Sequence, residues 1–195
     1  LTAFFNQTIS ADMQDIRLTF MKNVLQKSPV GEVLSAIAAL GLTDAWLAGG
    51  AIRNPIWKAR FGEACQLGIN DYDIAFWNPE GDQAEENRAK EILLARFPDY
   101  TFDVKNQASF GIWRWPEQKP YVSSADGISK WLHTATATGV RLDQSGEWEW
   151  LLPYGTDDLW DGIIRPTPIQ IGNPVAEAKA LKFLSACPAL RIMPH

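Results

Sequence analysis

The sequence contains little cysteine and histidine, with two of each among 195 residues. Two cysteines are too few for a disulfide scaffold, and these four residues are too widely spaced to predict a zinc site. We expect Cys65 and Cys187 to be reduced thiols, although the sequence leaves a single bridge between them open. Neither a disulfide framework nor structural zinc is therefore expected to hold the fold together.

Long apolar runs are also absent. No segment approaches the roughly 20 apolar residues that a membrane-spanning helix needs. Residues 1–25 lack the basic start and continuous apolar core of a secretion signal. We therefore expect a cytoplasmic protein without a membrane partner. The formal net charge of −5 argues against a broad nucleic-acid footprint, and no DNA-binding patch is evident, although a local basic groove stays compatible with that charge.

The length and the ordinary apolar and charged fractions predict one globular domain over residues 1–195 with a well-buried core. We expect helices over 10–27, 32–40, 51–61, 82–97, 107–113, 124–132, 157–160 and 173–186. We expect strands over 43–48, 71–77, 100–105, 134–141 and 163–165, with an alternating segment over 147–152. Ser10, Asp82 and Asn173 have side chains typical of helix N-caps, and Pro55 is expected in the first turn of its helix or as an interruption. This order predicts an α+β fold in which helices flank a small mixed β-sheet.

The clearest predicted strand carries two carboxylates. Asp71 and Asp73 alternate with apolar side chains between residues 71 and 77. Because residues i and i+2 of a strand point to the same face, these two carboxylates can share a hard divalent metal. Asp103 has the same alternation on the next predicted strand, so three carboxylates converge if the two strands are adjacent. The alternative is that this Asp-x-Asp pattern lies near a strand end and simply faces water.

A glycine pair lies between a predicted strand and a predicted helix. Without side chains, Gly49 and Gly50 would let phosphate groups approach the backbone N–H groups at the helix N-terminus. Arg53 could neutralise a phosphate and Asn54 could contact one. The alternatives are a tight turn for the glycines, a surface position for Arg53 and a cap for Asn54. The sequence has no Walker-type Gly-Lys-Ser/Thr and no Rossmann glycine pattern.

These segments together carry a resemblance. LAGGAIRN at residues 47–54, NDYDIAF at 70–76 and YTFDVKNQ at 100–107 resemble the DNA polymerase β-like nucleotidyltransferase superfamily. They are most similar to a small bacterial nucleotidyltransferase family whose physiological substrate is generally unassigned. TATATGVR at 134–141, PYGTDDL at 153–159 and RP at 165–166 match that family too, so the resemblance covers about residues 43–168.

The resemblance implies a polymerase β palm-like fold and a reaction. Gly49 and Gly50 match the motif that binds the triphosphate of a nucleoside triphosphate, and Asp71 and Asp73 match the pair that ligates two Mg²⁺ ions, with Mn²⁺ as an alternative metal. Asp103 matches the third acid, which also ligates metal and helps to activate the acceptor hydroxyl. A nucleoside monophosphate would be transferred to that hydroxyl and pyrophosphate released.

Two further basic residues are candidates for contacts with the substrates. Lys105 lies on the predicted face of Asp103 and is a candidate contact for phosphate or acceptor, with a solvated edge lysine as the alternative; for Arg141 a structural role is favoured. The acceptor is unknown and is expected to be a small molecule, a protein or RNA. Residues 1–42 would be N-terminal helices, 43–110 the catalytic core, and 111–195 a tryptophan-rich part packed on it.

One feature departs from the family pattern. The interval from Gly50 to Asp71 is longer than in the compact superfamily motif, so the segment over 57–70 reshapes the nucleotide site or weakens it. Two alternatives to nucleotidyl transfer follow. One is a catalytically weak nucleotide-binding module of the same fold. The other is a metal-dependent phosphohydrolase that uses the same carboxylates with water as acceptor.

Overall fold

A five-stranded mixed sheet with the strand order β3-β2-β1-β4-β5 is the centre of the fold. The computed structural model describes residues 2–109 and 120–194, and the side chains from residue 13 onward within those ranges. The strands are β1 (Trp46–Ala48), β2 (Tyr72–Phe76), β3 (Phe102–Asn106), β4 (Gly139–Leu142) and β5 (Trp148–Leu151). β2 and β3 are parallel, whereas the other neighbouring strands are antiparallel. The short strands β6 (Ile163–Ile164) and β7 (Arg191–Ile192) form a separate parallel pair.

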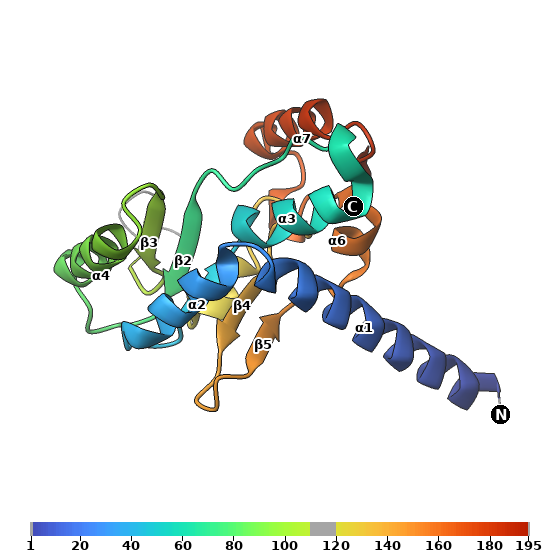
Figure 1. Ribbon diagram of the computed structural model, residues 1–195. Coiled ribbons are helices and arrows are strands. Elements are labelled where there is room, and N and C mark those ends of the chain that lie inside the picture. The colour runs from blue at the N-terminus through green and yellow to red at the C-terminus, as the bar shows by residue number, and fades with distance from the viewer. Residues whose placement is uncertain (1, 110–119, 195) are drawn as a thin grey trace.

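The helices surround this sheet in a simple arrangement. They are α1 (Thr2–Gln26), α2 (Val30–Ala39), α3 (Gly50–Phe61), α4 (Gln83–Arg96), α5 (Ser124–Ile128), α6 (Asp157–Asp161) and α7 (Pro174–Ala186), with 3₁₀ turns at Gly62–Ala64 and Pro168–Gln170. Figure 1 shows α3 across the middle, α1 and α2 on one side of it and α7 on the other, while α4 lies at the β3 edge. Within the described ranges, no helix has the length and apolarity that crossing a membrane requires.

The two faces of the sheet differ. One face is apolar because alternate residues, such as Leu47, Ile74 and Val104, belong to the main buried cluster formed with the helices. The opposite face has a smaller cluster around Trp46 and Ala48. Since side chains alternate along each strand, the aspartates of β2 and β3 project on this second face. The sheet therefore leaves one face free for a polar site.

The predicted α+β class is confirmed, and most predicted elements lie close to their expected ranges. The expected caps at Asp82 and Asn173 are confirmed, because their side chains accept hydrogen bonds from backbone N–H groups of the helices that follow. The cap at Ser10 is wrong, since α1 already begins at Thr2. Pro55 lies inside α3 without ending it.

Three further expectations need correction or fall outside the described residues. Residues 134–138 form a turn and a bend, and the strand begins only at Gly139, because the backbone N–H groups of Thr136 and Ala137 donate to the His133 carbonyl instead of to a neighbouring strand. Ile163–Ile164 is not the last strand, since Arg191–Ile192 pairs with it. Most of the expected helix over 107–113 lies outside the described residues, and 107–109 form a turn.

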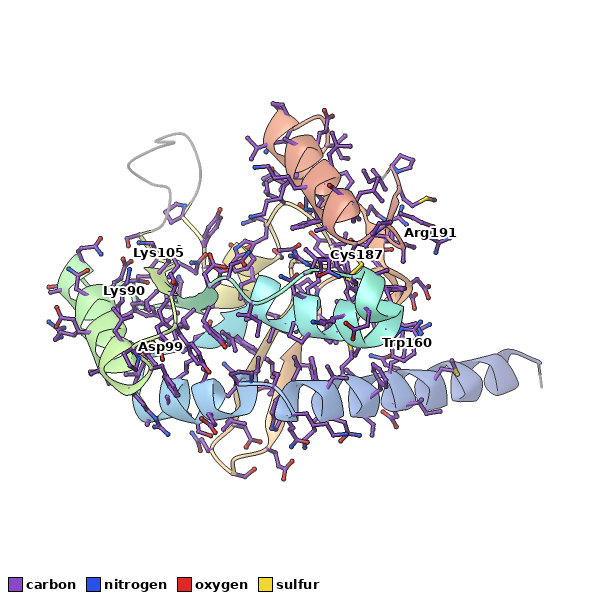
Figure 2. The ribbon with its side chains drawn as sticks, turned by 45° about the horizontal axis from the view of Figure 1, so that its top comes forward. Lys90, Asp99, Lys105, Trp160, Cys187 and Arg191 are labelled. Atoms are coloured by element: carbon purple, nitrogen blue, oxygen red, sulfur yellow. A yellow bond between two sulfur atoms is a disulfide. The ribbon has the colours of Figure 1, made fainter. Side chains whose placement is uncertain are left out.

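The expectation of two reduced thiols is wrong in the structure, which joins Cys65 to Cys187 by a disulfide. The two residues are 122 positions apart in the sequence, which hides their proximity. The segment after α3 and the end of α7 lie side by side, and the Gln66 N–H donates to the Ala186 carbonyl over 2.7 Å. Figure 2 shows the sulfur atoms at Cys187, between α3 and α7. Both cysteines are buried.

Breaking this bond is expected to destabilise the protein. A cross-link that closes a long loop restricts the unfolded chain, and such bonds contribute about 2–4 kcal/mol. Urea unfolding with and without a reductant should therefore give a free energy of unfolding lower by about this amount in the reductant. The Cys65→Ser/Cys187→Ser variant should show no response to the reductant. Equal stability of the wild type under both conditions, or two alkylatable thiols in the unreduced denatured protein, would contradict the bond.

Candidate active site

The predicted carboxylates lie at one end of the sheet. β2 and β3 are adjacent and parallel, and their register places Asp73 directly beside Asp103. On its other side, Asp73 is paired with Ala48, the last residue of β1. Asp71 precedes the first residue of β2 and is exposed. Neighbouring strands are about 4.8 Å apart, so the backbone itself brings Asp73 and Asp103 close together on one face.

Asp73 is the electrostatic centre of this group. The pKa of its carboxyl is raised to about 7, first by burial and then by the negative charges of Asp71 and Asp103, while Lys179 and Arg53 act in the opposite direction. A carboxylate with two like-charged neighbours is costly to ionise, and a nearby cation relieves that cost. The site therefore has an unbalanced negative charge at the position where the strands meet.

The chemistry of this donor set fits a divalent metal such as Mg²⁺. Carboxylate oxygens are the ligands that hard cations prefer, and the crowding at Asp73 is the kind that such a cation relieves. Within residues 2–109 and 120–194, however, no three acidic, histidine or cysteine side chains are close enough together to hold one ion. The Asp103 carboxylate lies 3.6 Å from the Lys105 ammonium.

The glycine pair brings backbone against this carboxylate. Gly49 has φ of +70°, and a Cβ at this position would lie 3.0 Å from an Asp73 carboxylate oxygen and 2.7 Å from the Trp131 ring. Only glycine combines this backbone conformation with such a close approach. The Gly49 N–H is already used, since it donates to the Thr138 carbonyl over 3.0 Å.

The N-terminus of α3 begins directly after this turn. No side chain caps α3, and its first hydrogen bonds run from Ile52 and Arg53 back to the Gly49 carbonyl. The N–H groups of Gly50 and Ala51 therefore have no partner among the described residues. Free N–H groups and the positive end of the helix dipole attract anions, so this turn is suited to a phosphate group.

Arg53 and Asn54 lie beneath the turn and are buried, so the surface position considered for Arg53 is wrong. Arg53 donates from Nε and Nη2 to Asn54 Oδ1, over 3.0 and 2.8 Å, and from Nη1 to the Thr136 hydroxyl. Its guanidinium lies 3.9 Å from the centre of the Phe183 ring. Burial lowers the pKa of Arg53 to about 9, although Asp73 and Asp71 act to raise it.

The hydrogen bonds of Asn54 and Arg53 show that both side chains are held within the protein. Asn54 does not cap the helix, because its Nδ2 donates to the Gly68 carbonyl over 2.7 Å and so holds the segment that enters β2. That segment belongs to the long interval between glycines and aspartates, which is therefore a positioned part of the site. The guanidinium nitrogens of Arg53 donate to the neutral side chains of Asn54 and Thr136, so its positive charge is not cancelled by an ion pair.

Lys105 lies beside Asp103 and is about two-fifths exposed. Its ammonium is 3.5 Å from the carboxylate of Glu86, which also accepts the Asn106 N–H over 2.8 Å. Figure 2 shows Lys105 at the β3 edge of the molecule. Arg141, for which a structural role was favoured, pairs with Asp44 and Glu149.

Several neighbours of the site were missed by sequence reasoning. Trp131 packs against Gly49, Thr136 accepts from Arg53, and Phe183 lies under its guanidinium. Lys179 acts on Asp73 through its charge. All four residues lie 58 to 110 positions beyond Asp73, in segments whose spacing indicates only secondary structure. The inward spacing of Ala176, Ala180 and Phe183 was the available signal that α7 packs against the core.

His133 links the segment before β4 to helix α7. It is buried, its Nε2 donates to the Ala176 carbonyl of α7 over 3.0 Å, and its Nδ1 has no hydrogen-bond partner among the described residues. The pKa of His133 is lowered to about 4, mainly by burial and also by the charges of Arg53 and Lys179, while the hydrogen bond to the Ala176 carbonyl acts to raise it. The imidazole is therefore neutral and structural, which agrees with its contact to α7.

A family model described as nucleotidyltransferase matches residues 35–192, most of the chain. The chain belongs to this nucleotidyltransferase family. The resemblance inferred from the glycine and aspartate segments is thus confirmed, and the protein is an enzyme of this class whose substrate these matches do not specify.

Solved structures extend the comparison. This nucleotidyltransferase is similar to a protein whose NMR structure reveals a CCA-adding enzyme head domain, with 28% identity, a TM-score of 0.76, and coverage of 90% of this chain and 95% of that one. Two tRNA-processing enzyme structures, the apo form I and complex 3, share the fold at 18% and 17% identity, with TM-scores of 0.52 and 0.54. The match covers 84% and 83% of this chain but 42% and 43% of theirs. No curated protein matches the chain.

The close approach at Gly49 predicts a specific cost for a methyl group. Gly49→Ala should lower the free energy of unfolding by about 1–3 kcal/mol more than Gly155→Ala, because an added group in a packed site also displaces its neighbours. Gly155 is the matched control, since its φ is +71° and a Cβ there would meet nothing within 4 Å. Urea denaturation measures both; equal losses would show that the contact with Asp73 and Trp131 is unimportant.

His133 predicts an acid-sensitive link to α7. Its pKa of about 4 in the folded protein is below the ordinary 6.5, so the unfolded chain binds the proton more tightly. The contribution of neutral His133 to the free energy of unfolding is complete above pH 6.5 and is lost as the pH falls through 4. The wild type should lose about 2 kcal/mol more than His133→Gln between pH 7 and pH 5 in urea unfolding. Parallel stability profiles of the two proteins would contradict this assignment.

Proposed function

We propose that this nucleotidyltransferase moves a nucleoside monophosphate from a nucleoside triphosphate to an acceptor hydroxyl and releases pyrophosphate. The observation that carries the proposal is the register of β2 and β3, which sets Asp73 beside Asp103 at the turn formed by Gly49 and Gly50. Membership of the family supports the class of reaction. A phosphate-binding helix start next to paired carboxylates is what nucleotidyl transfer requires.

The metal of this proposal is Mg²⁺, with Mn²⁺ as an alternative. Asp71, Asp73 and Asp103 would hold it, with Asp73 at the centre because its carboxylate has the least compensated charge. When bound, divalent ions neutralise phosphate charge and align the attacking and leaving oxygens. Asp103 would turn away from Lys105 to join the other two carboxylates, a change of side-chain rotamer on a fixed strand.

The residues of the chain then have distinct tasks. The free N–H groups at the start of α3 bind phosphate oxygens, and Gly49 lets the phosphates come close to Asp73 because it has no side chain. Arg53 supports this anion from within the protein through its charge. Asp103 orients the acceptor hydroxyl and accepts its proton, while Lys105, released from Asp103, contacts phosphate or acceptor.

The acceptor is proposed to be a small molecule, a protein or RNA. RNA is supported by the likeness to a CCA-adding enzyme head domain, which spans nearly the whole of this chain. The net charge of −5 favours a short contact with any nucleic acid. We place the reaction in the cytoplasm, where nucleoside triphosphates are abundant, and the burial of both cysteines would shield their bond from reducing thiols there.

Removing the charge of Asp73 tests this function. Asp73→Asn keeps the size of the side chain but removes the negative charge, so pyrophosphate release from nucleoside triphosphate and Mg²⁺ should fall at least about 100-fold. Asp103→Asn should have a loss of similar size. A coupled pyrophosphate assay with a panel of acceptors and of the four nucleotides measures both.

Asp99→Asn provides the matched control. Asp99 lies four residues before Asp103, is exposed, and appears away from Lys105 in Figure 2, so its variant should keep wild-type activity. Unchanged pyrophosphate release in Asp73→Asn would overturn the proposal. Nucleotide binding without pyrophosphate release in the wild type would indicate the binding module, and orthophosphate or nucleoside monophosphate formed without acceptor would indicate the hydrolase.

A further inference from the structure

Helix α7 is attached at three points to elements that carry or adjoin the site. Near its start, the Ala176 carbonyl accepts from His133. In its last turns, the Phe183 ring supports the Arg53 guanidinium. Directly after its end, Cys187 is bonded to Cys65 in the segment that leads to β2. Each attachment connects α7 to an element that contacts the aspartates or the glycine turn, so the helix has a defined position over the site.

Lys179 lies between these attachment points. It is three residues after Ala176 and four residues before Phe183, and side chains at such spacings are neighbours on a helix surface. It is exposed, and within the described part of the chain it forms no ion pair. Phe183, one turn further along α7, lies 3.9 Å from the Arg53 guanidinium, and this guanidinium lies 3.9 Å from where a Cβ of Gly50 would be. Lys179 is therefore next to the part of α7 that approaches the glycine turn, and its charge also lowers the pKa values of Asp73 and His133.

The other cations around the site already have partners. Arg53 is buried with its fork on Asn54 and Thr136, and Lys105 lies between Asp103 and Glu86. An incoming nucleoside triphosphate reacts at its α-phosphorus and carries further negative charges on its β- and γ-phosphates. Lys179 is thus the exposed cation near Asp73 that can reach a ligand without breaking a contact of the folded protein.

We propose that Lys179 binds the β- and γ-phosphates of the nucleotide and stabilises the pyrophosphate as it leaves. This inference rests on the proposed nucleotidyl transfer. In that reaction the acceptor oxygen forms a bond to the α-phosphorus, and the bond from this phosphorus to the bridging oxygen breaks. The electron pair of the broken bond stays on that oxygen, which becomes part of the pyrophosphate. The ammonium of Lys179 stabilises this developing charge and does not exchange a proton.

The test compares Lys179→Gln with Lys182→Gln. Lys182 is on the same helix, one turn later, and is also exposed, so its variant controls for a general loss of positive charge on α7. Binding of inorganic pyrophosphate in the presence of Mg²⁺, measured by calorimetry, should weaken about 10- to 100-fold in Lys179→Gln, since a charged hydrogen bond to phosphate is lost. Lys182→Gln should bind as the wild type does, and Lys179→Arg should restore most of the affinity.

Activity gives a second readout. Lys179→Gln should raise the KM for nucleoside triphosphate and weaken product inhibition by pyrophosphate, whereas a merely structural lysine would leave product inhibition unchanged. Equal pyrophosphate affinity in the wild type and Lys179→Gln, with circular dichroism showing both folded, overturns the inference. If the wild type releases pyrophosphate from nucleotide and this affinity is unchanged, the proposed function stands and the role of Lys179 falls. If no nucleotide is turned over but pyrophosphate binding still depends on Lys179, the proposed function falls, and Lys179 keeps a role in phosphate binding but not in stabilising a leaving group.

Discussion

The crowding of negative charge at Asp73 is the constraint around which the rest of the site is arranged. A parallel register fixes Asp103 beside it, and Asp71 precedes it on the same chain segment. Three ionised carboxylates at one sheet end repel one another, so positive charge nearby favours the ionised form of Asp73. The protein supplies part of that charge from Arg53 and Lys179, which act on Asp73. In the proposed reaction, a divalent metal would supply the remaining positive charge.

That arrangement explains why distant segments are tied together. Arg53 can be buried without an ionic partner because Asn54, Thr136 and the Phe183 ring enclose it. Removing any of these would leave a desolvated cation, which is far costlier than losing one exposed ion pair. The disulfide and the His133 contact hold α7, which carries Phe183, against the core. The C-terminal helix therefore supports Arg53 beside the candidate site, although it begins about 70 residues beyond Asp103.

Most strands, most helices and the proximity of Asp73 to Asp103 were predictable because they follow from local periodicity and from one assumption about adjacent strands. Long-range contacts were not. Nothing in the sequence links Cys65 with Cys187, and the exposed lysine on α7 has the same local pattern as any solvated one. Arg53 shows a related limit: arginine is mostly a surface residue, and only the packed aromatic ring and amide show why this one is buried.

The most direct test of nucleotidyl transfer is the fate of the phosphates. The protein is incubated with Mg²⁺, cell extract and a nucleoside triphosphate labelled either at the α- or at the γ-phosphorus. No pyrophosphatase is added, and the pyrophosphatases of the extract are inhibited. We predict that the α-label becomes attached to an acceptor and that the γ-label appears in pyrophosphate. Label released as orthophosphate or free nucleoside monophosphate, with no labelled acceptor, would contradict it.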